Sequence, residues 1–232
     1  MTGRWRPWGA MLLLIALSVA GNGCRSGPDI TAARTTPTEF GQIPLPPPRQ
    51  SGDTPLEEAI ATRRSVREFT GQELSWEEVS QLLWSAQGQT DPRGLRAAPS
   101  AGALYPLEVY AALPDGAYHY LPSQHAVEQV SDTDLREDLW EAGLRQDALR
   151  QAPAIFVIAA VYQRTEVKYG QRAERYVLME AGHAAQNLLL QAVALNLGAV
   201  PIGAFYDDQV VEGLGLPSDH RPLYLIPVGH PR

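Results

Sequence analysis

The long apolar helix predicted from about residue 171 to residue 197 most constrains the fold of this chain. Its second half is apolar on almost every side, and Gly198 follows it as the expected C-cap. Such a helix belongs at the centre of the molecule or at a subunit interface. Upstream, the nearly continuous apolar run from Ala154 to Tyr162 starts after Pro153 and predicts a strand that is buried on both faces.

Two shorter helices are predicted near the start of the folded region. The first begins after an N-cap at Asp53 or Thr54 and turns three apolar residues inward: Leu56, Ala59 and Ile60. The second begins at the capping box Ser75-x-x-Glu78 and stops at Gly88.

Further strands and a helix complete the expected set. Residues 107–113 are strand-like, Asp115-Gly116 signals a hairpin, and residues 127–130 continue the sheet. Residues 131–150 are expected to be helical, and a last strand covers residues 223–228.

Residues 1–23 have the three parts of an export signal. Arg4 and Arg6 precede an apolar run over residues 10–20 that is too short to span a bilayer, and small residues follow it. Cys24 comes next and is the only cysteine, so neither an internal disulfide nor a cysteine metal site is expected. The region resembles a bacterial lipoprotein signal, which implies lipidation of Cys24 and an exported, membrane-anchored protein of the cell envelope facing the periplasm or exterior. An ordinary cleaved signal with an incidental cysteine is the alternative.

Residues 24–52 are rich in proline and lack apolar periodicity, which predicts an extended tether. The remaining residues, 53–232, suffice for one domain with a sizeable core.

A cluster of cationic side chains follows the first helix, in the sequence Arg63-Arg64-Ser65-Val66-Arg67. Planar guanidiniums and a hydroxyl suit the oxygens of a phosphate group, although a short basic run is also typical of a solvated surface. The whole chain has 19 Lys and Arg against 26 Asp and Glu, a net charge of −7. This balance argues against a nucleic-acid partner.

Two other segments carry candidate site residues. Pro99 to Pro106 contains small residues and Ser100, which suits either close approach of a flat ligand or a tight loop. Glu180 and His183 are part of a polar stripe on the long helix that continues to Gln186 and Asn187. One Glu-x-x-His copy cannot build a di-iron site, and no His-Glu-x-x-His occurs, so no metal is expected. A buried hydrogen-bond network, or a symmetric contact across a dimer, is the favoured interpretation of His183.

Five segments together resemble the FMN-dependent nitroreductase superfamily, and within it the SagB-type, or thiazoline/oxazoline dehydrogenase, branch. They are Arg-Arg-Ser-x-Arg-x-Phe at 63–69, Pro-Ser-Ala-Gly-Ala-Leu-Tyr-Pro at 99–106, Lys168-Tyr169-Gly170, Glu180-x-x-His183-x-x-Gln186-Asn187, and residues 198–205. The resemblance implies an α+β fold with a central, mainly antiparallel sheet flanked by helices. It also implies a homodimer with FMN at the subunit interface.

The resemblance assigns roles to individual residues. Arg63, Ser65 and Arg67 would hold the FMN phosphate, with Arg64 nearby and Arg232 reaching it from the end of the chain. The flavin would be lined, in part from the partner subunit, by Pro99, Ser100, Ala101, Gly102, Ala103 and Leu104. The flavin N5 edge would face Pro201, Ile202, Gly203 and Ala204.

Lys168 and Tyr169 match a Lys-Tyr pair that assists proton removal while flavin N5 accepts the hydride. The resemblance implies an oxidoreductase that acts on a small-molecule or peptide-derived substrate. Export argues against a cytoplasmic azoline substrate and against NAD(P)H. Three alternatives stay open: Lys168 as a solvated surface residue, a lipid-anchored ligand-binding module on the same fold without turnover, and an unrelated envelope domain.

Overall fold

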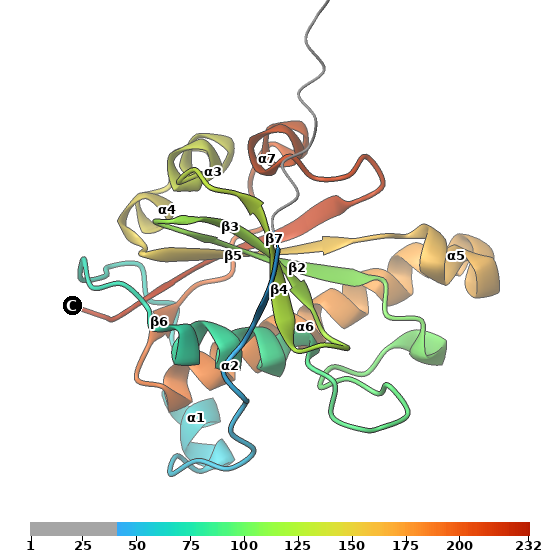
Figure 1. Ribbon diagram of the computed structural model, residues 1–232, viewed down its shortest axis with the longest axis horizontal. Helices are drawn as coiled ribbons and strands as arrows, with labels where there is room; N and C mark the ends of the chain where they lie inside the picture. The colour runs from blue at the N-terminus through green and yellow to red at the C-terminus, as the bar shows by residue number, and fades with distance from the viewer. Residues whose placement is uncertain (1–40) are drawn as a thin grey trace, which may run out of the picture. The chain divides into compact units, whose positions relative to one another are not determined.

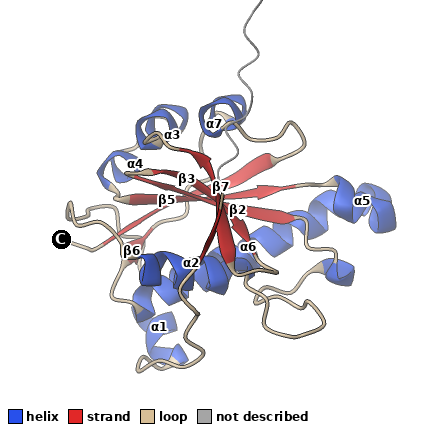
Figure 2. Cartoon of the chain, in the orientation of Figure 1, coloured by secondary structure: helices blue, strands red, loops and turns tan. Residues whose placement is uncertain are grey.

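The computed structural model describes residues 41–232. The predicted signal over residues 1–23, the lipidation site at Cys24 and the tether as far as residue 40 lie outside the described residues. The described part is an α+β domain with one antiparallel sheet between two layers of helices (Figures 1 and 2). This confirms the expected fold class.

The sheet has seven strands in the order β1-β4-β3-β2-β5-β7-β6. The strands are β1 (Gln42–Pro44), β2 (Leu107–Leu113), β3 (Gly116–Leu121), β4 (Ala126–Ser131), β5 (Ala154–Ala160), β6 (Gly198–Ala199) and β7 (Arg221–Gly229). The helices are α1 (Leu56–Thr62), α2 (Trp76–Gln87), α3 (Arg136–Ala142), α4 (Asp147–Gln151), α5 (Gln163–Tyr169), α6 (Ala173–Ala194) and α7 (Asp207–Leu214). Two short 3-10 turns are η1 (Ala101–Ala103) and η2 (Gly170–Arg172).

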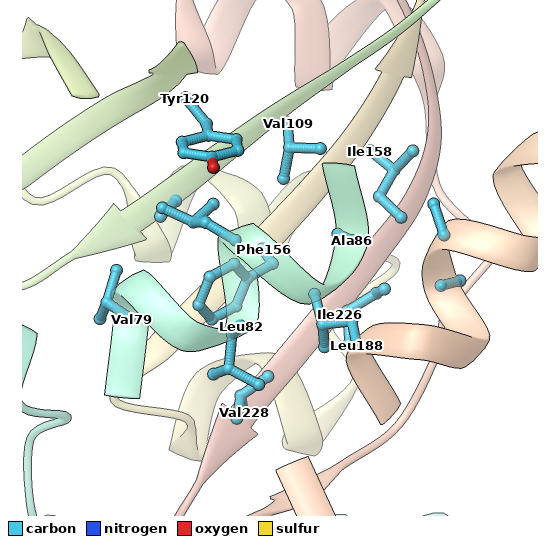
Figure 3. Packing of buried hydrophobic residues seen from close by; sticks show 14 of the residues in the cluster. Val79, Leu82, Ala86, Val109, Tyr120, Phe156, Ile158, Leu188, Ile226 and Val228 are labelled. Carbon is cyan, nitrogen blue, oxygen red and sulfur yellow. The ribbon is translucent and has the colours of Figure 1, made fainter. Parts of the chain in front are cut away.

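Strand β5 is the inner strand that the apolar run predicted. All seven of its residues are buried, and it pairs with β2 on one side and β7 on the other. Alternate side chains enter two separate cores, because successive residues of a strand point to opposite faces. Phe156 and Ile158 pack against α2 and α6 (Figure 3), whereas Ile155 and Val157 pack on the side of α3, α4 and α7.

Several local signals are confirmed. Ser75 and Glu78 form the complete capping box of α2, and Gly88 ends that helix. The turn at Asp115-Gly116 joins β2 to β3 as an antiparallel hairpin.

Three helical expectations were wrong in detail. In α1 only Ala59 is buried, while Leu56 and Ile60 are 60% and 57% exposed. The helix expected over 131–150 breaks between α3 and α4, where Leu144 and Arg145 take positive φ angles. Helix α6 ends before Gly198, because Asn196 takes the left-handed conformation and Gly198 already belongs to β6.

Residues 42–49, expected to be part of a free tether, dock onto the domain. Strand β1 pairs with β4, and Leu45 is buried in the core. The Pro46 carbonyl accepts hydrogen bonds from Ser80 Oγ at 2.6 Å and His125 Nε2 at 2.9 Å. Proline ends a strand but still offers a carbonyl acceptor, so a Pro-rich segment can occupy a sheet edge. Among residues 41–232, no helix is both long enough and apolar enough to cross a membrane.

Candidate active site

The arginine cluster lies on an extended segment at the β6 edge of the sheet. Ser65 forms an isolated parallel bridge with Ala199, and Val66 N–H donates to the Ala199 carbonyl at 3.1 Å. Gly198 makes this approach feasible, because a Cβ there would lie 2.6 Å from Val66 Cγ1. Val66 therefore faces the sheet edge, while the flanking Ser65 and Arg67 side chains are exposed.

The end of the chain returns to the same place. Thr70 N–H donates to the His230 carbonyl at 2.8 Å, and Arg232 N–H donates to the Glu68 carbonyl at 3.3 Å. Phe69, between these contacts, is 1% exposed and anchors the segment in the core. The Arg232 backbone is thus brought next to the segment that carries the arginine cluster.

The guanidiniums of this cluster are free of carboxylate partners within residues 41–232. Arg64 donates only to the carbonyls of Ala61 and Arg63, and Arg67 only to that of Ser65. Every described ion pair with a nitrogen–oxygen distance up to 4.0 Å involves other residues. Several uncompensated cations around a hydroxyl, in a chain of net charge −7, form a donor set that fits a phosphate group.

Residues 201–204 continue from β6 along β7. Ile202 N–H donates to the Leu225 carbonyl at 2.8 Å, and Gln146 Nε2 donates to the Ala204 carbonyl at 3.0 Å. Gly203 and Ala204 are exposed, and no atom lies within 4 Å of the position that a Gly203 Cβ would take. Backbone is therefore accessible here, as expected.

Residues 99–105 form a strained loop. Gly102, Ala103 and Tyr105 take φ angles of 65°, 55° and 48°, a region that L-residues other than glycine rarely occupy. Tyr105 is held by hydrogen bonds at both ends: its N–H donates to Ser100 Oγ at 2.9 Å, and its hydroxyl accepts from Arg96 N–H at 3.1 Å. These contacts help to hold Tyr105 in its strained conformation.

Lys168 and Tyr169 meet this loop at Gly102. A Cβ on Gly102 would lie 2.9 Å from Lys168 Nζ and 3.0 Å from the Tyr169 hydroxyl. The Tyr169 ring also packs edge-on against Tyr176 of α6, with ring centroids 4.9 Å apart. The two predicted segments therefore come together, although they are more than 60 positions apart in the sequence.

The arginine cluster and the Lys168 group lie at opposite ends of β5. The register pairs Ala154 with Val228, next to β6, and Ala160 with Arg221, next to α5. Six steps along an antiparallel strand span about 20 Å. Figure 1 shows β6 and α5 on opposite sides of the domain. A single chain therefore does not bring all of the predicted site residues into one place.

Sequence reasoning gave no role to the buried carboxyl of Glu180, which lies behind the strained loop. Glu180 is 2% exposed, and its Oε1 has no hydrogen-bond partner in the described structure. Burial raises the pKa of Glu180 to about 7, although Ser100, Arg96 and Gln87 partly counter this. A carboxyl that titrates near neutral pH therefore lies against Ser100 of the candidate site.

The rest of the polar stripe on α6 is less buried. His183 and Gln186 are exposed, so the expected buried network around His183 is absent from the described residues of the single chain, while the alternative of a symmetric contact across a dimer stays a prediction. Asn187 donates to the Ala97 carbonyl at 3.3 Å and so supports the segment before the loop. Within residues 41–232, no three His, Cys, Asp or Glu side chains are placed to hold a metal ion.

Comparison with known proteins gives consistent matches. A model described as the nitroreductase family matches residues 60–230. A protein of Methanocaldococcus jannaschii that is provisionally named a nitroreductase, MJ1384, is 44% identical over 180 residues, covering 75% of this chain and 90% of the relative. The crystal structure of a provisionally named nitroreductase from Ralstonia eutropha JMP134 superimposes with a TM-score of 0.74 at 33% identity, over 82% of this chain and 90% of that chain.

Two more distant relatives have more specific names. The microcin B17-processing protein McbC of Escherichia coli is 30% identical over 156 residues, covering 62% of this chain and 57% of McbC. An FMN reductase (NADPH) of Bacillus subtilis is 26% identical over 188 residues, covering 75% of this chain and 65% of the relative.

Glu180 predicts a pH dependence of stability. A carboxyl whose pKa rises from 4.5 to about 7 on folding favours the folded state only while it is protonated. Its contribution is therefore lost as the pH rises from the unfolded to the folded value, by on the order of 3 kcal/mol. We expect Glu180→Gln to unfold at higher denaturant than the parent at about pH 8, and at a similar concentration at about pH 5. Glu174→Gln, on the exposed side of the same helix, is the control. Equal shifts at both pH values would contradict the assignment.

Proposed function

The chain belongs to the nitroreductase family and is an FMN-dependent oxidoreductase, and we propose that it acts in the manner of the SagB-type dehydrogenases. In this proposal it removes a hydride and a proton, that is two electrons and two protons in all, from a small organic or peptide-derived substrate that contains a ring such as an azoline. The McbC match supports a peptide-derived substrate only at 30% identity.

One observation carries the proposal: the Lys168 amine and the Tyr169 hydroxyl meet at Gly102, in the strained loop. Conversion of an azoline to an azole needs a base for one carbon-bound proton and an acceptor for a hydride. Lys168 would accept the proton in its neutral form, and Tyr169 would orient the substrate by a hydrogen bond. Bound FMN supplies the hydride acceptor.

The remaining predicted residues would bind the cofactor. Arg63, Arg64, Ser65, Arg67 and Arg232 would bind the phosphate, for which their charges and hydroxyl are suited. Residues 99–104 would line the ring system, and residues 201–204 would present backbone to its reactive edge.

We further propose a homodimer in which each site draws on both chains. The two halves of the site lie at opposite ends of β5, about 20 Å apart, which favours a flavin that contacts one half from each chain. Exposed apolar residues support such an interface: Leu178 and Met179 on α6 are 48% and 47% exposed, and Leu56 and Ile60 extend from α1, which packs on α6.

The phosphate assignment is tested by comparing FMN with riboflavin, which lacks the phosphate. We expect the double variant Arg63→Ala/Arg67→Ala to bind FMN at least about 10-fold more weakly and riboflavin unchanged, because charge-assisted hydrogen bonds to the phosphate are lost. Arg145→Ala, an exposed arginine paired with Glu141, is the matched control. If the parent protein stays colourless with added FMN, the proposal of a flavin-dependent enzyme is excluded. If it binds FMN but turns over no substrate, the alternative of a ligand-binding module on the same fold is favoured.

The shared site is tested by mixing two variants after subunit exchange. Lys168→Ala alone should lower kcat by about 100-fold or more with FMN retained, because a positioned base is lost. Mixing it with Arg63→Ala/Arg67→Ala should restore about a quarter of the parent activity, because half of the randomly formed dimers carry one intact site. No restoration, with mixed dimers shown by mass spectrometry, would mean that one chain supplies the whole site. Unchanged turnover by Lys168→Ala would exclude Lys168 as the base that accepts the proton.

We also propose that the protein is exported and lipid-anchored at Cys24, because only three residues separate the apolar run over residues 10–20 from this cysteine. We expect cells to incorporate labelled palmitate into the full chain and not into Cys24→Ala. An unlabelled, secreted parent protein would support the ordinary cleaved signal instead.

A further inference from the structure

Helix α5, which carries Lys168, is weakly held by apolar contacts. It has seven residues, of which only Thr165 is buried, and Val167 is 89% exposed. A helix of two turns is not stable by itself, so contacts with the rest of the domain must fix it. Tyr169 supplies one contact, against Tyr176, at the end of the helix.

Arg164 supplies a contact of a different kind, one turn before Lys168. Its guanidinium pairs with the Glu108 carboxylate of β2, and its Nη1 also donates to the Tyr105 carbonyl at 3.1 Å. One side chain thus joins α5 to the sheet and to the strained loop. The planar, forked guanidinium suits this double contact, which the single ammonium of lysine would not reproduce.

Glu108 is built into the sheet as an anchor. It is 9% exposed, and its second oxygen accepts from His119 Nε2 at 2.7 Å. The His119 ring stacks on Tyr110 with centroids 4.5 Å apart, which fixes its orientation. Burial disfavours the Glu108 carboxylate, but His119 and Arg164 outweigh this and hold its pKa below the usual range. The anchor is therefore ionised at neutral pH.

The Tyr105 backbone links this anchor to the loop. With a φ of 48°, Tyr105 needs external contacts to keep its conformation, and its carbonyl is the group that Arg164 holds. Its N–H is held by Ser100, two residues before Gly102. Movement of Arg164 would therefore release both sides of the contact between Gly102 and Lys168.

We propose that Arg164, fixed by Glu108, is a positioning residue that sets the place of the Lys168 amine relative to residues 99–105. It does so by holding α5 and the Tyr105 carbonyl at once. The inference rests on the proposed function only in giving Lys168 a chemical role; the anchoring of α5 stands without it.

Hydrogen–deuterium exchange on the full-length protein tests whether Arg164 holds α5 in place. Arg164→Ala should speed amide exchange over residues 163–170 by at least about 10-fold, because local opening of α5 becomes easier. Exchange in β5 and in the second half of α6 should not change. Arg164→Lys should give an intermediate rate, and Arg145→Ala the parent rate. Parent-like exchange in α5 of Arg164→Ala, or equally faster exchange throughout the domain, would overturn the proposal.

A double-mutant cycle then tests whether Arg164 acts through Lys168. The probe is a synthetic peptide with one thiazoline, and its oxidation is followed by mass spectrometry. Arg164→Ala should lower kcat by about 10-fold with FMN content unchanged, and should have little further effect in the Lys168→Ala background. Independent, multiplying losses would show that Arg164 does not act through Lys168. If Lys168→Ala alone changes nothing, the proposed base fails, while the exchange experiment still decides the anchor.

Discussion

The continuous burial of β5 is the constraint on which the arrangement of the site depends. Because this strand is covered on both faces, no ligand can cross the sheet at its centre, and chemistry is confined to its ends. The chain places arginines at one end, beside β6 and the C-terminus, and Lys168 with the strained loop at the other. The seven-residue length of the strand keeps the two groups apart, which favours a flavin site that draws on two chains. The proposed dimer follows from this separation as well as from the exposed apolar residues of α1 and α6.

The two ends of the strand are built in different ways. At the arginine end, the backbone hydrogen bonds of residues 65–70 hold an extended segment, and the guanidiniums of the cluster form no ion pair with a carboxylate of residues 41–232. At the Lys168 end, the buried Glu108 carboxylate pairs with Arg164 of α5, whereas the buried Glu180 carboxyl lies behind Ser100 and has one oxygen without a partner in the described residues. Free cations suit an anionic ligand that arrives from solvent. Buried, paired charges suit a place where position must be kept against backbone strain.

Much of the fold could be predicted because its signals are local. The apolar run of β5, the capping box at Ser75 and the Asp115-Gly116 turn each depend on a few neighbouring residues. The exposure of Leu56 and Ile60 could not be predicted, because apolar spacing indicates a covered face without telling whether the same chain covers it. The docking of residues 42–49 also depends on distant partners, since Pro46 offers only a carbonyl and its donors lie on α2 and before β4.

The candidate site shows the same limit. Residues 63–67, 99–104 and 168–169 were found because they are clustered in the sequence, and the structure brings Lys168 and Tyr169 to Gly102. The residues that hold this part of the site in place, Glu108, Arg164 and His119, were not predicted. Each is a single polar residue that belongs to no recognisable sequence motif. Glu108 occurs in a strand of otherwise apolar residues, where a carboxylate is costly unless it is paired. Such an isolated charge in a buried strand is the signal that could have pointed to Arg164 and His119, because a stable fold must supply partners for it.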